Sequence, residues 1–534
     1  MAPFSLERDF QQPGRSVAVG IHGMAATSHP AATLAAVDIL RRGGNAMDAA
    51  IAACAVQCVV EPAMTGIGGD CFVLYAPRGS AEVRAFNGAG RAPARLDAAA
   101  LRAEGLAAIP ATSPHAVTIP GAVDAWARLA SAHGSQPLAT LLAPAIALAE
   151  DGFAVTPRVA HDWAESAARV GGRTETAAAY LPQGRAPLAG EIVKFPALAR
   201  TLKAIADQGR TAFYEGRVAD EIIAILGAEG GRHTAQDFAT AEGAAVTPIE
   251  TRYRQYRVHE CPPPGQGIIA LLILNILSHF PAVGDPLDPA RLHIEIEAAR
   301  LAYAARDAVL AEGSPATGQH LLSAEFAAGL AARIDPTARM PSLPAFSGPE
   351  HRDTVYLTVV DRERNVVSFI NSIFESFGSG ILAPESGVLL HNRGMSFRLE
   401  DGHPNTLAPR RQPMHTIIPG LMTEGDSARM AFGVMGGHFQ AMGQAHLVSK
   451  IVDFGMDPQA ALDLPRVFPV PGAERVSAEA TLPEESCKGL AALGHVIEPT
   501  AEPIGGGQAI WIDQARGTLL AGSDPRKDGL ALGF

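Results

Sequence analysis

Cysteine is scarce in this chain, and its spacing excludes two common uses of the residue. Five cysteines occur among 534 residues, and no two of them form a CxxC pair. The sequence therefore indicates neither a zinc knuckle nor a disulfide framework. Cys54 and Cys58 lie one helical turn apart in a segment rich in alanine and valine. We expect both to be buried as small apolar side chains.

A hydrophobic run long enough to cross a membrane is also missing. The longest run, Ile268 to Leu277, is too short for a bilayer and predicts a buried helix. The first residues, MAPFSLERDFQQPG, lack the basic and apolar regions of a signal peptide. We therefore expect a soluble, cytoplasmic protein with no membrane partner.

Positive charge is in deficit. The formal net charge is −12, which argues against a nucleic-acid partner because such proteins present a basic face. Hydrophobic residues make up 47% of the chain and charged residues 18%, which indicates a globular protein. No internal repeat or low-complexity tract is present. The composition is compatible with an enzyme that acts on small molecules.

What is present is a mixture of helical and strand patterns. Apolar stripes predict helices near residues 31–60, 137–152, 214–231, 291–309 and 440–454. Alternating runs separated by turn residues predict hairpins after residue 354 and near residues 505–526. Strands framed by helices predict an α/β (α+β) fold with stacked sheets and helices outside them.

The clearest linker lies at residues 334–353, which contain four prolines and precede a hairpin that opens at Thr354. A threonine freed at an N-terminus can use its own α-amine as a base, because that amine has a pKa of about 7.7–8.0. One residue would then supply both nucleophile and base. Threonine is also common at strand starts, so these residues alone favour an ordinary strand.

Three further patterns have a chemical and a structural interpretation. Gly436-Gly437 ends a predicted strand, where backbone N–H groups can face an oxyanion, although glycine pairs more often make tight turns. GIGGD at 66–70 lacks the lysine of a phosphate loop and leads into a strand, so we reject that interpretation. His293, Glu295 and Glu297 do not share one helical face well, which favours a structural helix over a metal site.

Several ordered stretches together resemble the γ-glutamyltransferase family of N-terminal nucleophile hydrolases. They are GGNAMDAAIAA, GIGGDCFVL, the segment from Asp353-Thr354 to GVLLHN, PRRQPMHTIIPGLM, FGVMGGH and the ending GSDPRKDGLALGF. The matches cover nearly the whole chain in order and spacing. The resemblance implies a four-layer αββα sandwich made as a self-cleaving precursor, without a cofactor or metal.

The resemblance also implies how the chain would be divided. Cleavage between Asp353 and Thr354 would give a large subunit, 1–353, and a small subunit, 354–534, that stay together as one catalytic unit. This αβ heterodimer leaves open a further α2β2 assembly. Thr354 would be the nucleophile, Ser372 a neighbouring hydroxyl, and Gly436 and Gly437 the oxyanion hole.

The chain departs from the family where that family binds an α-amino acid. Ala89 stands in the place of a carboxylate-binding arginine, and Arg91 follows two residues later. Phe374 and Ser396 stand where an asparagine and an aspartate hold the α-amino group. The pocket therefore loses its acceptors for an ammonium group.

The same pocket gains basic side chains. Arg393 replaces a glutamine, and His415-Thr416 replace two adjacent serines. Arg393, with Arg91 or His415, could hold a substrate carboxylate. For Arg91, pairing with an acidic neighbour is an equal alternative, whereas for Arg393 we favour substrate binding because it replaces a pocket residue.

These departures predict hydrolysis of a small, anionic, carboxylate-bearing amide through a Thr354 acyl-enzyme ester. The branch of the family that the pattern resembles is the oxamate amidohydrolases. The alternative is a γ-glutamyltransferase or glutathione hydrolase. Acylase action on bulkier amides and an inactive scaffold homologue are less favoured.

Overall fold

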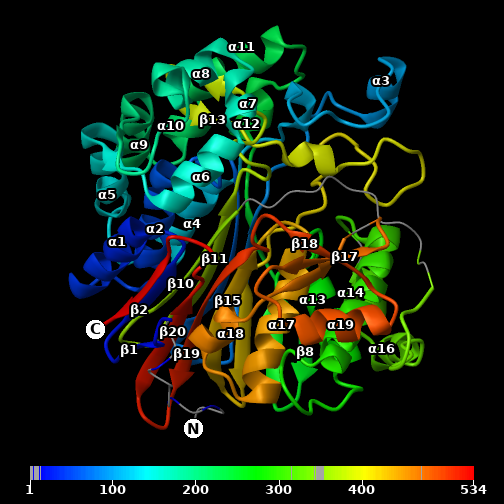
Figure 1. Cartoon of the computed structure of the whole chain (residues 1–534). Helices are drawn as coiled ribbons and strands as arrows, with labels where there is room; N and C mark the ends of the chain where they lie inside the picture. Colours follow the sequence, from blue (N-terminus) through cyan, green and yellow to red (C-terminus); the bar gives the residue numbers. More distant parts are fainter. Residues whose placement is uncertain are drawn as a thin grey trace.

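A computed structural model describes residues 4, 6, 11, 14–313, 315–341, 343, 354–470 and 472–534. Two seven-stranded sheets lie at the centre of the fold, and helices cover their outer sides (Figure 1). One cluster of apolar side chains fills the space between the sheets, and two larger clusters lie under the helices. The layers therefore follow the order αββα, as the sequence predicts.

The first sheet contains the strand that Thr354 precedes. Its order is β21-β2-β10-β11-β3-β4-β7, with every pair antiparallel. The strands span Leu530–Gly533, Met24–Thr27, Val355–Val360, Val366–Ser372, Asp70–Ala76, Arg84–Gly88 and Ala244–Val246. The predicted hairpin after residue 354 is confirmed as β10 and β11, which occupy the middle of this sheet.

The second sheet carries the glycine turn. Its order is β1-β20-β19-β15-β14-β9-β8, again antiparallel throughout. The strands span Ala18–Gly20, Thr518–Ser523, Gly506–Asp513, Ser427–Met435, Gly420–Glu424, Tyr256–Glu260 and Ile249–Tyr253. The predicted C-terminal hairpin is confirmed as β19 and β20.

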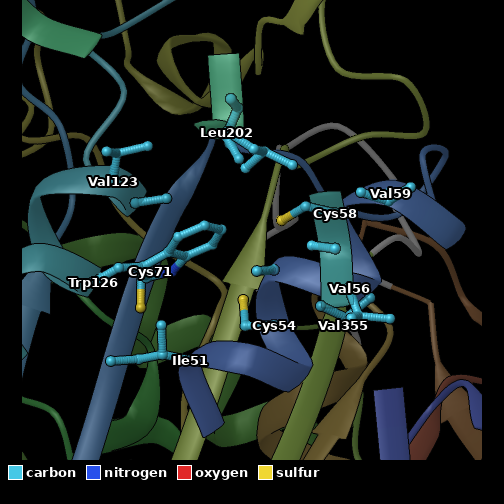
Figure 2. Packing of buried hydrophobic residues seen from close by; sticks show 14 of the residues in the cluster. Ile51, Cys54, Val56, Cys58, Val59, Cys71, Val123, Trp126, Leu202 and Val355 are labelled. Atoms are coloured by element: carbon cyan, nitrogen blue, oxygen red, sulfur yellow. The ribbon is translucent and has the colours of Figure 1, made fainter. Parts of the chain in front are cut away.

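Helix α2, Ala46–Val60, packs on the outer face of the first sheet and is buried on all sides. Small residues allow α1, Pro30–Arg41, and α5, Leu138–Asp151, to pack closely against it. Cys54 and Cys58 are buried in this layer as free thiols, as predicted, and Figure 2 shows them facing Cys71 and its apolar neighbours. Each fully buried valine or isoleucine here contributes about 1.5–3 kcal/mol.

Helices α13, Gly267–Leu277, α14, Pro289–Val309, and α17, Phe439–Phe454, form the layer on the second sheet. The buried run at 268–277 is therefore a helix, as expected, and α17 begins within a residue of its predicted start. None of the described helices is both long and apolar enough to cross a bilayer. Asp353 and most of the predicted linker, residues 342 and 344–353, lie outside the described residues.

Candidate active site

Thr354 lies directly before β10, and its side chain is buried. Its Oγ1 is 3.3 Å from the Oγ of Ser372, the last residue of β11. The Nε2 of Gln440, in the first turn of α17, donates to Thr354 Oγ1 over 3.4 Å. The structure thus brings together two hydroxyls that the sequence paired, and it adds Gln440, which sequence reasoning missed.

Strand register extends this pair into a row across the sheet. Val355 is opposite Asn371, and Ser372 is opposite Asp70 at the start of β3. Directly opposed residues in a sheet place their side chains on the same face. Asp70 therefore lies on the same face as Ser372, although the sequence marked it only as the end of a glycine loop.

The turn at Gly436 and Gly437 links β15 to α17 and requires glycine. Gly436 has φ 118° and Gly437 has φ 58°, in the region that favours glycine. A Cβ on Gly436 would lie 2.9 Å from the Cα of Gly505. The amide of Gln266 holds the turn by donating to the carbonyl of Gly437 over 2.9 Å. The turn therefore presents backbone, and no side chain, beside the N-terminus of α17.

Arg393 is the central cation of the predicted substrate pocket. Its guanidinium is buried, and its Cζ lies 3.8 Å from the ring centroid of Phe374. It donates to Thr416 Oγ1 over 3.2 Å. Within the described part of the chain, no carboxylate lies within ion-pair distance of it. Burial lowers the pKa of Arg393 to about 9, although the charge of Asp70 opposes that shift.

Phe374 connects this pocket to the hydroxyl row. Its φ is 79°, an uncommon conformation for an aromatic residue. Its N–H donates to Ser372 Oγ over 2.9 Å, which fixes the bend after β11. Ser372 therefore orients both Thr354 and the ring on which Arg393 stacks. The sequence placed Phe374 in the pocket but gave no signal for this backbone conformation.

Asp70 is the buried anion of the site. One of its oxygens, Oδ1, accepts N–H groups from Gly90 over 2.9 Å and from Gly121 over 3.3 Å. The other, Oδ2, lies 3.4 Å from His391 Nδ1 and 3.3 Å from His415 Nε2. Burial alone would raise the pKa of Asp70, but the two imidazoles outweigh it and hold that pKa well below its usual value. Asp70 is therefore ionised at neutral pH.

Arg91 lies in a different setting from Arg393. Its side chain is about half exposed, 48%, and forms an ion pair with Glu312 over 2.7 Å. It also donates to the carbonyl of Arg410 over 2.9 Å. Its pairing with an acidic neighbour is thus observed, while its predicted contact with a substrate stays a prediction.

Ser396 is nearly buried and lines a cavity of about 350 Å³. His438, which follows Gly437, and Arg306 of α14 line the same cavity. Arg306 donates to Gln266 over 2.6 Å and lies 3.0 Å from His438 Nδ1. This network was missed by sequence reasoning, because its members come from three distant segments.

His293, Glu295 and Glu297 of α14 do not all converge on one point, as the sequence predicts. Glu295 pairs with Lys450 and Arg291, whereas His293 and Glu297 lie near His495. Both nitrogens of His293 have partners, and Arg300 and the N–H of Met340 hold the oxygens of Glu297. The ligand atoms of His293 and Glu297 thus have protein partners, whereas the buried Nδ1 of His495 has none among the described residues.

The two stacked sheets between helix layers, with Thr354 at the start of a central strand, define an N-terminal nucleophile hydrolase fold. The family model for gamma-glutamyltranspeptidase matches residues 32–534, and the chain belongs to this family. The chain is 35% identical to the glutathione hydrolase-like YwrD proenzyme of Bacillus subtilis, and the match covers 97% of this chain and 99% of the relative. It is 33% identical to the oxamate amidohydrolase proenzyme of Klebsiella pneumoniae, with the same coverage.

Among solved structures, the chain is similar to a cephalosporin acylase from Bacillus halodurans. The TM-score is 0.92 at 39% sequence identity, and 99% of each chain is covered. These relatives are hydrolases, and several are named as proenzymes. The comparisons therefore support an amide-hydrolase assignment at the level of the family, which includes more than one substrate class.

Proposed function

We propose that this protein is a self-processing amidohydrolase that acts on a small amide bearing a carboxylate, such as oxamate. The observation that carries the proposal is the buried guanidinium of Arg393. Among the described residues, no carboxylate forms an ion pair with Arg393, and the charge of Asp70 acts on it from beyond ion-pair distance. A bound substrate carboxylate would relieve the remaining cost of burying this cation. The Phe374 ring, on which this guanidinium stacks, has no hydrogen-bond acceptor for an ammonium group.

Processing would cut the Asp353–Thr354 bond and give chains 1–353 and 354–534. The freed α-amine of Thr354 then accepts the proton of its own hydroxyl, and Oγ1 attacks the amide carbonyl. The amides of the Gly436-Gly437 turn would hold the oxyanion, and Ser372 would orient the attacking hydroxyl. The C–N bond breaks, and the NH2 group of the substrate takes the proton from the α-ammonium of Thr354 and leaves as ammonia. Water then hydrolyses the Thr354 ester and releases the acid.

The test is a substrate panel with purified protein. Ammonia release from oxamate is compared with release of the anilide from a γ-glutamyl anilide. We expect oxamate to have the higher kcat/KM. Strong cleavage of the γ-glutamyl compound with none of oxamate would reverse the assignment in favour of a glutathione hydrolase.

A second candidate, an acylase for bulkier amides, is favoured by one observation. The cavity of about 350 Å³ beside Ser396 and His438 is larger than oxamate requires, and its wall includes the apolar side chains of Met395 and Met414. Adipyl and glutaryl amides of aromatic amines probe this space. A kcat/KM for either that exceeds that for oxamate would favour the acylase.

A further inference from the structure

Among the described residues, Asp70 is an acid whose charge acts on Arg393, and the family-based prediction did not consider it. An acid next to a cation could serve an α-amino acid, because the acid would bind the ammonium group while Arg393 bound the carboxylate. The question is therefore whether Asp70 faces a substrate. The answer decides which class of substrate the proposed site accepts.

The surroundings of Asp70 leave little room for a substrate ammonium group. Its Oδ1 already accepts two backbone N–H groups, and its Oδ2 is buried between two imidazoles. His391 and His415 lie 3.4 and 3.3 Å from Oδ2 without well-aligned hydrogen bonds, and both rings stand against this oxygen. The exposed fraction of the whole residue is 1%.

His415 is one of the two imidazoles beside Asp70, and the charge of Arg393 also acts on it. Burial and the charge of Arg393 lower the pKa of His415 to about 4, so its ring is neutral at pH 7. The ring packs against Phe72 with 5.0 Å between centroids. Thr416, the next residue, is the hydrogen-bond partner of Arg393. His415 therefore contacts the anion, and the residue that follows it bonds the cation.

We propose that Asp70 is an internal counter-charge for Arg393, and that His415 shields it from the substrate and so excludes amides that carry an α-ammonium group. The pocket then presents a cation and an aromatic face to its ligand. It accepts an anionic acyl group and rejects its amino-acid counterpart. The inference deepens the proposed function and rests on it for the identity of the site.

The experiment compares ligands that differ only in the ammonium group. Succinamate and L-asparagine are both primary amides, so ammonia release gives kcat/KM for each. Butanoate and L-2-aminobutanoate contain no amide, and calorimetry gives their Kd without turnover. We expect the wild type to prefer the ammonium-free member of each pair by about 100-fold or more.

Removing the shield should narrow this preference. In His415→Ala we expect Oδ2 of Asp70 to face the pocket. The ratio of kcat/KM for succinamate to that for L-asparagine, and the matching ratio of affinities, should then shift by about tenfold or more toward the ammonium compound. His415→Gln keeps an N–H donor at this place and should retain the wild-type ratio. Adding Asp70→Asn to His415→Ala should abolish the shift, because the exposed anion is gone.

His259 provides a matched control, since it is buried and lies 3.3 Å from the carboxylate of Glu250, away from Arg393. His259→Ala should leave both ratios unchanged.

The inference is overturned if the wild type prefers the ammonium compound, or if His415→Ala leaves both ratios as they are. If His415→Ala does not fold, the wild-type preference and the ratio in His415→Gln still decide. Failure to hydrolyse any amide would refute the proposed function, while the calorimetric ratios would still test the shield.

Discussion

The hydroxyl oxygens of Thr354 and Ser372 lie 3.3 Å apart at the ends of two paired strands. Ser372 also accepts the N–H of Phe374, so one side chain orients the proposed nucleophile and the wall of the pocket. The position of the proposed nucleophile is thus set by sheet register and by a neighbouring side chain. Changes at this row should therefore affect processing and turnover together.

Thr354→Ala should give a single uncut chain without amidase activity, because both the nucleophile and its hydroxyl proton are removed. Gel electrophoresis and mass spectrometry of the purified protein give the result, with fragments of 1–353 and 354–534 expected only for the wild type. Thr354→Ser keeps a hydroxyl and should still be cut, more slowly. A cut Thr354→Ala chain would refute self-processing at this residue.

Arg393→Gln should raise KM for a carboxylate-bearing amide by about 10- to 100-fold, since a hydrogen bond to a charged group contributes about 1.5–3 kcal/mol. Acetamide lacks the carboxylate, and its kcat/KM should change little. Arg393→Lys keeps the charge without the planar guanidinium, so its KM should lie between those of the wild type and Arg393→Gln. Equal losses for both amides would mean that Arg393 supports only the fold.

The same cation predicts an alkaline limit for activity. The pKa of Arg393 is lowered to about 9, so the charged form that binds a carboxylate is lost as the pH rises through 9. The kcat/KM for oxamate should therefore fall about tenfold per pH unit above this value. Acetamide measured in the same buffers should not show this limb. A fall in kcat/KM above pH 9 that both amides share would assign the titration to another group.

Gly436→Ala should slow both processing and hydrolysis, because its Cβ would lie 2.9 Å from the backbone of Gly505 and would displace the turn. We expect a loss of about 100-fold in kcat, the size of effect seen when one oxyanion donor is lost. Gly517 is the control, since its φ is also positive, at 71°, and a Cβ there meets nothing within 4 Å. Gly517→Ala should keep wild-type kcat.

Glu295→Gln should destabilise the protein by about 3–5 kcal/mol, because it leaves Lys450 buried without its anion and leaves Arg291 with Asp453 alone. Urea unfolding followed by tryptophan fluorescence measures the loss at pH 7. Glu150 and Lys203 form an exposed pair, so Glu150→Gln should change the free energy of unfolding by less than about 1 kcal/mol.

The stabilisation that Glu295 provides should also depend on pH. Burial would raise the pKa of Glu295, but Lys450 and Arg291 outweigh it and hold that pKa well below its usual value. The stabilisation is therefore fully present above the unfolded pKa of about 4.3 and is lost as the pH falls below it. The difference between wild type and Glu295→Gln should narrow at pH 3. A constant difference would mean that the charge of Glu295 is not the cause.

Local pattern in the sequence was sufficient for much of the fold. The hairpin from Thr354 to Ser372, the glycine turn at 436–437 and helix α17 each carry a period or a turn residue that fixes them. Asp70 could not be predicted in this way. Its role depends on the register of β3 on β11 and on His391 and His415, which lie more than three hundred residues away in the chain. The shield on Asp70 is visible only in three dimensions.

The strand order of the first sheet has a consequence for how the chain is made. Ala26 on β2 pairs with Thr358 on β10, and β3 pairs with β11 on one side and with the nearby β4 on the other. Until the ribosome has passed residue 372, β2 therefore has no partner and β3 is paired on one side only. Such distant pairings fold slowly and leave strand edges open meanwhile. The N-terminal region is therefore synthesised with open strand edges, and the late strands β10 and β11 protect it from pairing with other chains once they are made.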